Sequence, residues 1–210
     1  MIGAVPIVGT VGAEMFNRLI APPLQKRQQE WMDDVATELR RLAATNRLRL
    51  EDLPNNPAFV DAVMTASQAA IRTSQREKRD ALRNAVLRSA LPGAPDIDIQ
   101  QIFLGLIDRL SVNHLRVLQL FQNPTNWFGV ARQSVNWQQF KVADDILHVA
   151  FPDLKVHHEL GRQIWTELYA AGLVDIHTLV NPGEGDRVMK KRTTPYADQL
   201  LRFIESPFVG

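Results

Sequence analysis

Apolar side chains recur every three or four residues along most of this chain, which is the spacing of one face of an α-helix. In the segment 24–45 the repeat is carried by Trp31, Val35, Leu39 and Leu42, at spacings of four, four and three. Pro22 and Pro23 stand just before it, and proline is favoured in the first turn of a helix because its missing N–H would have no partner there. The pattern predicts a long helix that begins near these prolines and buries one side.

Start and stop signals divide the rest of the first half into further helices. Asn56-Pro57 combines a capping residue with a first-turn proline and predicts the start of an alanine-rich helix. Ser74-Gln75-Arg76-Glu77 has the spacing of a capping box and opens the next one. Pro92-Gly93-Ala94-Pro95 breaks the chain. Asp96 or Asp98 can then cap another helix, so the break is the predicted boundary between two domains.

The pattern after residue 110 has the element order of a winged helix. It predicts a helix capped by Ser111, a loop longer than a minimal winged helix needs, and a second helix that stops at Pro152. A third helix follows, with Leu160, Ile164 and Leu168 on its buried side and Gly172 at its end. Segment 181–185 supplies turn residues for a β-hairpin, and a last helix closes the domain.

These elements predict a mainly α protein in two parts. Residues 1–95 are expected to form an apolar N-terminal arm and a helical bundle. Residues 96–210 are expected to form a winged-helix-like domain with a small β-hairpin. A winged helix is a binding module, so the pattern favours binding over catalysis.

Polar side chains on the third helix of that domain, and on the returning strand of the hairpin, are the candidate binding residues. A helix in a DNA groove needs such side chains aimed at base edges, and basic residues beside it can reach phosphates. Glu159 and Glu167 on the same helix repel phosphate, and many winged helices dock on proteins instead. The partner is therefore a protein or DNA. The candidate residues are Arg162, Gln163, Thr166, Arg187, Lys190, Lys191 and Arg192.

The first 13 residues form an apolar segment without a charged side chain. No Lys or Arg precedes the apolar run, which does not fit a signal peptide, and roughly 20 apolar residues would be needed to span a bilayer. Two interpretations stay open. The segment is an arm packed on the helices or at a homo-oligomer contact, or its glycines let it associate with a membrane. The candidate contact residues are Ile2, Val5, Ile7, Val8 and Val11.

Composition narrows the function further. The formal charge of the 210 residues is +1 at pH 7, so any attraction to nucleic acid must come from a local patch. Arginines and a lysine gather near the start of the helix that follows Ser74, but Glu77 and Asp80 among them indicate a solvated face. The chain has no cysteine, which excludes disulfides and thiol chemistry and fits a cytoplasmic location.

Neither a catalytic nor a metal-binding motif stands out. The chain has no HExxH, no GxSxG and no phosphate-binding glycine loop. The rings of His157 and His158 would point about 100° apart on a helix, which is a poor arrangement for a metal ion. Asp144 and His148 are four residues apart, which favours an ordinary contact on a helix surface. We therefore expect no enzymatic activity, no cofactor and no metal site.

One stretch carries a family resemblance. It includes Arg79-Asp80-Ala81-Leu82-Arg83-Asn84-Ala85, the break at Pro92, and the segment 103–111 leading into His114-Leu115-Arg116-Val117-Leu118. In these helix-and-break patterns the chain resembles the bacterial abortive-infection alpha family. The resemblance implies a small helical protein of phage defence with no catalytic residue to carry over. The chain departs from that family in its acid-poor N-terminal arm and in the longer loop after Phe121.

Together these observations predict a non-enzymatic bacterial module that docks on a protein or nucleic acid through a winged helix. The alternative is a membrane-acting effector that uses its glycine-rich apolar N-terminal segment, which would add membrane association to the cytoplasmic location.

Overall fold

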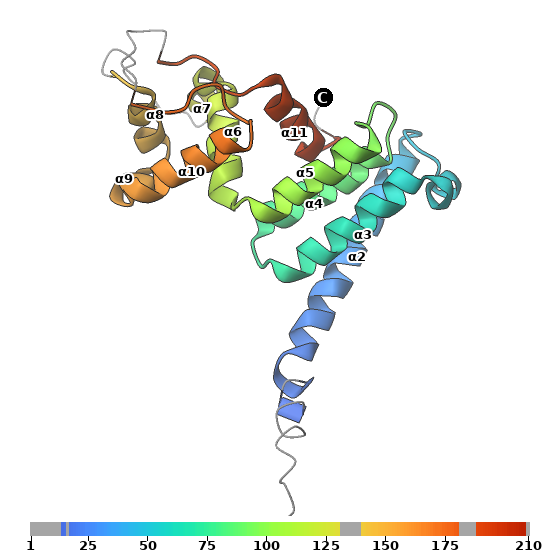
Figure 1. Cartoon of the computed structure of the whole chain (residues 1–210). Helices are drawn as coiled ribbons and strands as arrows, with labels where there is room; N and C mark the ends of the chain where they lie inside the picture. Colours follow the sequence, from blue (N-terminus) through green and yellow to red (C-terminus); the bar gives the residue numbers. More distant parts are fainter. Residues whose placement is uncertain (1–13, 16, 131–139, 181–187, 209–210) are drawn as a thin grey trace, which may run out of the picture. The chain divides into compact units, whose positions relative to one another are not determined.

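A computed structural model describes residues 14–15, 17–130, 140–180 and 188–208. All regular secondary structure in these ranges is helical, so the prediction of a mainly α protein is confirmed (Figure 1). The chain divides into two compact units, residues 1–104 with residue 210 and residues 105–209. The division between them falls inside the helix α5.

The first unit is a helical bundle, as predicted. Its elements are α2 (Ala21–Ala44), the 3₁₀ helix η1 (Leu50–Asn55), α3 (Pro57–Arg72), α4 (Arg76–Ser89) and most of α5 (Ile97–Arg109). α2, α3 and α4 pack against one another. α3 buries four alanines, whose small side chains allow close packing of its neighbours. Trp31 of α2 is 2% exposed and donates a hydrogen bond from Nε1 to Oγ of Ser67 on α3, at 2.9 Å.

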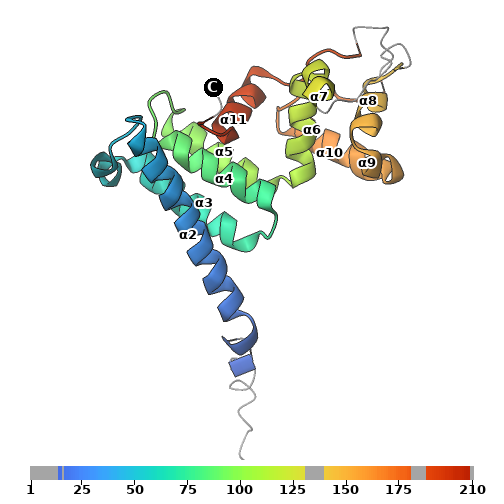
Figure 2. The same cartoon turned by 180° about the vertical axis from the view of Figure 1, so that it is seen from behind.

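The N-terminal part of α2 extends from this bundle and contacts it through Arg27, whose Nη1 donates to the carbonyl of Ile71 on α3 at 3.5 Å. None of the described residues from Glu14 to Glu30 is buried, and both views show this part of α2 extending beyond α3 and α4 (Figures 1 and 2). Met15, Leu19 and Ile20 are 61%, 57% and 45% exposed. In the described part of the chain, no helix is both long enough and apolar enough to cross a membrane.

The basic residues of α4 face acids rather than standing alone. Arg79 lies 3.8 Å from a carboxylate oxygen of Glu30 on α2. Arg76 and Arg83 lie 3.8 Å and 3.0 Å from the carboxylate of Asp80, one turn away on the same helix. These pairs neutralise much of the cluster, which agrees with a solvated helix face.

The second unit is built from the end of α5 and six further helices among its described residues. They are α6 (Val112–Gln122), α7 (Pro124–Val130), α8 (Ala143–Ala150), α9 (Pro152–Val156), α10 (His158–Ala170) and α11 (Pro195–Ile204). α10 packs against α6 and α9, and α11 packs against α6. At the centre, the rings of Phe121 and Trp165 meet edge to face with centroids 4.9 Å apart.

Two short helices, α7 and α9, begin at prolines where no helix start was predicted. Pro124 and Pro152 end the preceding helices, but each also occupies the first turn of the next one, α7 and α9. Asn123 caps α7, since its Oδ1 accepts a hydrogen bond of 3.0 Å from the backbone N–H of Asn126. The same asparagine–proline signal that begins α3 therefore begins α7 as well.

The predicted β-hairpin is absent from the described residues. Segments 174–180 and 188–193 share a single antiparallel bridge, between Val174 and Thr193. The backbone N–H of Asp175 donates to the carbonyl of Arg192 beside it, at 2.9 Å. The prediction of a hairpin is wrong here, and the turn expected at 181–185 lies outside the described residues.

The physical reason is that neighbouring helices take the hydrogen bonds a hairpin would need. Nε1 of Trp165 donates to the carbonyl of Ile176 at 3.0 Å. The carbonyl of Leu179 accepts from the backbone N–H of Asp144 at 3.3 Å, and the N–H of Arg192 donates to the carbonyl of Phe121 at 2.8 Å. Both segments are thus bound to helices, and they do not pair with each other beyond the bridge.

Candidate functional site

The outer face of α10 holds the predicted recognition residues. Ile164, Trp165 and Leu168 are buried and fix one side of the helix against its neighbours. Arg162, Gln163 and Thr166 are exposed on the opposite side, as expected. Leu160 was predicted on the buried side and is instead 42% exposed. It lies at one edge of the outer face, because 3.6 residues per turn places it about a quarter turn from the buried centre.

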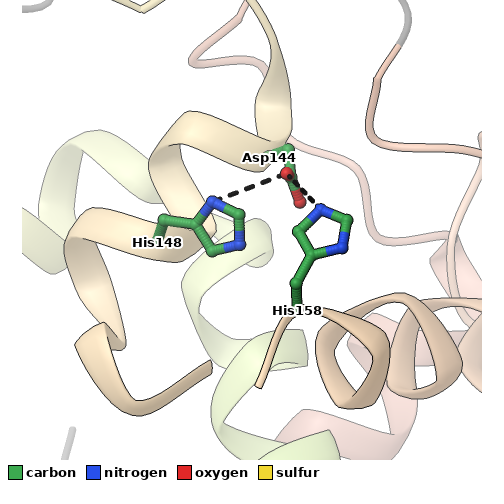
Figure 3. Close-up of side chains that lie close together, drawn as sticks. All are labelled: Asp144, His148 and His158. Carbon is green, nitrogen blue, oxygen red and sulfur yellow. Dashed lines mark ion pairs between the residues drawn. The ribbon is translucent and has the colours of Figure 1, made fainter. Parts of the chain in front are cut away.

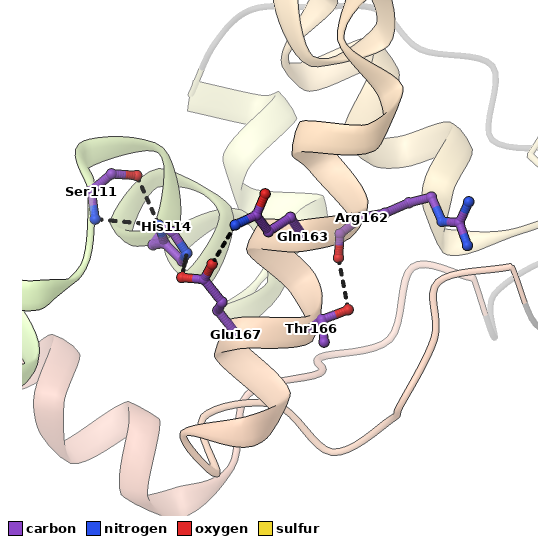
Figure 4. Close-up of polar contacts among 6 residues, drawn as sticks. All are labelled: Ser111, His114, Arg162, Gln163, Thr166 and Glu167. Atoms are coloured by element: carbon purple, nitrogen blue, oxygen red, sulfur yellow. Dashed lines mark hydrogen bonds and ion pairs between the residues drawn. The ribbon is translucent and has the colours of Figure 1, made fainter.

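The polar side chains of this face are already engaged with one another (Figure 4). Oγ1 of Thr166 donates to the carbonyl of Arg162 at 2.9 Å. Nε2 of Gln163 donates to Oε1 of Glu167 at 2.9 Å. The guanidinium of Arg162 lies 3.5 Å from a carboxylate oxygen of Glu159. A partner that needs these groups as hydrogen-bond donors must first displace these contacts.

Glu167 continues this set of contacts to α6. Its Oε2 lies 3.1 Å from Nε2 of His114, and Nδ1 of the same ring lies 2.7 Å from Oγ of Ser111 (Figure 4). The backbone N–H of Ser111 also donates to Nδ1, at 3.2 Å. A serine, a histidine and a carboxylate in a row are residue types of a hydrolytic triad. Here Nδ1 of His114 accepts from the backbone N–H of Ser111, the residue just before α6, and this is the geometry of a helix cap.

Among the described basic residues that follow residue 187, Lys191 is paired within the second unit. Arg187 lies outside the described residues. Lys190 is exposed, and Arg192 is half-buried. The ammonium of Lys191 pairs with the carboxylate of Asp198 on α11. Within the described ranges, no hydrogen bond or ion pair joins Lys190 or Lys191 to the polar residues of α10.

The pKa of Asp198 reports how strongly that pairing acts. Burial of the carboxylate tends to raise its pKa. Hydrogen bonds from Lys191 and Thr193, together with the charges of Lys191 and Arg202, outweigh this and hold the pKa below its ordinary value. The Thr193 hydroxyl donates to Oδ1 at 2.7 Å. The charge of Lys191 is thus balanced by Asp198 within the second unit.

Apolar and aromatic groups flank the outer face of α10. Tyr169 is 42% exposed at the edge opposite Leu160, and its ring meets that of His177 edge to face at 5.2 Å. A hollow of about 290 Å³ adjoins the Glu167 side. Its lining residues are Arg109, Leu110, Glu167, Ala170 and Ala171. The face therefore combines exposed apolar edges, a polar middle and a concave edge.

A second polar cluster joins α8 to the start of α10. Asp144 and His148 lie one turn apart on α8, as their spacing predicted, and the side chain of His158 meets the same carboxylate oxygen. His158 was not predicted as a member of this cluster, because the adjacent pair His157 and His158 by itself indicates no metal site. The spacing Asp144-x-x-x-His148 with a histidine ten residues later is the signal that was available.

The candidate contact residues of the N-terminal segment, Ile2, Val5, Ile7, Val8 and Val11, lie outside the described residues. The adjoining apolar side chains of Met15, Leu19 and Ile20 are exposed.

Comparison of this sequence and structure with protein-family models, curated proteins and solved structures finds no match.

Proposed function

We propose that this chain is a non-enzymatic binding module that docks on a protein through the outer face of α10. The observation that carries the proposal is the composition of that face. Leu160 and Tyr169 are both 42% exposed at its edges, while its polar middle is already hydrogen-bonded. Tyrosine and arginine are enriched in protein interfaces, where the polar groups are usually satisfied.

A protein partner is favoured over DNA by the state of the basic residues. Phosphate binding needs Lys and Arg that are free to neutralise phosphates and so release the counterions condensed on the DNA. Lys191 is paired with Asp198, and Arg162 with Glu159. Glu159 and Glu167 add negative charge to the same face, and the net charge of the chain is only +1.

The winged-helix interpretation belongs to the same proposal. It is supported by the helix order α6, α8, α10 and by the bridge between Val174 and Thr193, which lies just after α10, where a wing would begin. A role in bacterial phage defence rests on the family resemblance of segment 77–121 alone.

The experiment places a photo-crosslinking residue at position 162 or 169 of the full chain and exposes the protein to an extract of its host. We expect a discrete protein adduct from both positions. A matched probe at the exposed Asp98 of α5 should give none of that adduct. Equal adducts from position 98 would contradict docking through α10.

A titration with duplex DNA at two salt concentrations tests the rival partner. Charge reversal of Lys190 and Lys191 is compared with the unchanged chain. We expect that the unchanged chain shows no salt-sensitive binding to DNA that is lost when these two lysines are reversed in charge. Tight binding that weakens steeply with salt and collapses in the variant would replace the protein partner by nucleic acid.

The exposed N-terminal part of α2 favours one second candidate, a membrane-acting effector. Met15, Leu19 and Ile20 offer apolar surface beside the apolar segment 1–13. Flotation with anionic liposomes, before and after deletion of residues 1–13, decides this candidate. Binding that the deletion removes would support it, and an unchanged lack of binding would exclude it.

A further inference from the structure

Three side chains of the second unit converge on one point from two helices. Asp144 lies in the first turn of α8, His148 follows one turn later, and His158 begins α10 (Figure 3). Nδ1 of His148 and Nε2 of His158 each lie 3.5 Å from Oδ2 of Asp144. One nitrogen or oxygen atom from each of the three side chains lies within 4.8 Å of the other two.

These separations do not fit hydrogen bonds. A nitrogen and an oxygen that share a proton lie about 2.7–3.2 Å apart. Ligands of a tetrahedral ion with bonds of about 2.1 Å lie roughly 3.4 Å from one another, which is close to the two 3.5 Å separations from Oδ2 of Asp144. These are ion-pair distances, and the same spacing suits three ligands around a common centre, since no separation among them exceeds 4.8 Å.

His148 is well placed to act as a ligand, because its side chain is only 16% exposed and its Nδ1 faces the carboxylate of Asp144. Its other nitrogen, Nε2, is buried without a hydrogen-bond partner among the described residues, and an ion bound at Nδ1 would leave that atom unsatisfied. The neighbouring Asp145 does not compete for an ion, because its carboxylate caps α8 by accepting from the N–H groups of Lys141 and Val142.

The fold holds the two helices close together at this point. Gly161 lies one turn after His158, and a Cβ there would meet Cδ2 of Leu147 at 3.3 Å. Leu147 directly precedes His148 on α8. The close packing at this glycine brings the first turn of α10 against the helix that carries the other two ligands.

From this geometry we propose that Asp144, His148 and His158 form a binding site for a divalent transition-metal ion, with Zn²⁺ as the favoured ion. Imidazole and carboxylate are ordinary zinc ligands, and three protein ligands leave one position for water, as in zinc sites that are open to solvent. His158 is 46% exposed, so an ion can enter from solvent and the ring can rotate to close the site. None of the three ligands belongs to the docking surface proposed above, although Glu159 lies beside both.

A carboxylate also lies on the far side of one ligand. Oε1 of Glu159 is 3.9 Å from Nδ1 of His158, the nitrogen that does not face Asp144. This separation is too long for a hydrogen bond, and the same oxygen lies closer to the guanidinium of Arg162, at 3.5 Å, so Glu159 contributes negative charge beside the site rather than a fixed contact.

The test is a calorimetric titration of the tag-free full chain with Zn²⁺ after removal of metal by a chelator. We expect one saturable site per chain. His158→Asn and Asp144→Asn should each weaken it at least tenfold, whereas His157→Asn, the adjacent exposed histidine, should leave it unchanged. His158 is half-exposed, so its variant should fold normally, which circular dichroism would verify.

Titration with Co²⁺ gives a second readout that does not depend on affinity. Cobalt bound by two imidazoles and a carboxylate should show visible absorption bands that the His158→Asn variant loses. The proposal is overturned if the unchanged chain shows no saturable site, or if His157→Asn weakens binding as much as His158→Asn does.

Discussion

Asn56 and Asp198 show how single side chains stabilise each unit. Asn56 accepts a hydrogen bond of 3.1 Å from the backbone N–H of Phe59 and so satisfies one of the free N–H groups at the start of α3. Its role was predictable, because the capping residue and the proline after it form a purely local signal. Asp198 depends on Lys191 and Thr193, which reach it only after the chain has turned into α11.

Replacing the cap should cost a predictable amount of stability. Asn56→Ala is expected to lower the free energy of unfolding by about 1 kcal/mol, since an alanine cannot accept the hydrogen bond. Urea unfolding followed by circular dichroism measures the change. Asn55→Ala, at the exposed neighbouring position, is the control and should cost much less. Equal losses would mean that the hydrogen bond adds nothing.

Asp198 should make stability depend on pH at the acid end. Because its pKa is lowered in the folded protein, its contribution is fully present above the ordinary carboxyl pKa and is lost as the pH falls through the lowered value. Asp198→Asn is expected to cost about 1.5–3 kcal/mol at pH 7, the range for a hydrogen bond to a charged group. The gap between the two proteins should narrow below about pH 4. Urea unfolding at a series of pH values measures this, with Asp175→Asn at an exposed position as the control. A gap independent of pH would show that the charge is not responsible.

At the scale of elements, local signals predicted most helices. They did not predict that neighbouring helices take the hydrogen bonds that a β-hairpin would need. The spacing of apolar residues and the prolines identified α2, α3 and α10 near their observed bounds. The hairpin prediction failed because the carbonyls of Ile176 and Leu179 accept from α10 and α8. Partners so distant in the sequence leave no trace in a local pattern. For His158 the spacing to Asp144 and His148 is visible in the sequence, but the packing at Gly161 that brings it to α8 is not.

The contact between α8 and α10 should be sensitive to the size of one side chain. Gly161→Val is expected to lower the free energy of unfolding by about 2 kcal/mol, because the added atoms meet the buried Leu147. Gly105→Ala in α5 should instead stabilise by about 0.5–1 kcal/mol, since its Cβ meets nothing and alanine favours a helix. Thermal and urea unfolding compare the two. A neutral Gly161→Val would show that the two helices need not approach closely.

At the scale of the whole molecule, the stability of the first unit should not depend on the start of α2. Replacing Met15, Leu19 and Ile20 by serine is expected to change the free energy of unfolding by less than about 0.5 kcal/mol, because these side chains are exposed. Trp31→Ala should cost about 3–5 kcal/mol, since it removes a buried indole. Urea unfolding distinguishes the two variants. A large loss in the triple variant would reveal a contact with a second copy, which sedimentation would then show.

The unburied start of α2 also sets a distance. Residues 21–30 of α2 contain no buried side chain and span about 15 Å at 1.5 Å per residue. Ala21 therefore lies about that far along the helix axis from Trp31, the first buried residue of the bundle. Arg27 and Glu30 contact the bundle near the end of this stretch, so residues 21–26 are the part whose length can change without altering those contacts. Each added helical turn would increase the reach by about 5.4 Å, so the separation between the bundle and an N-terminal attachment point is a property that evolution or design can adjust on its own.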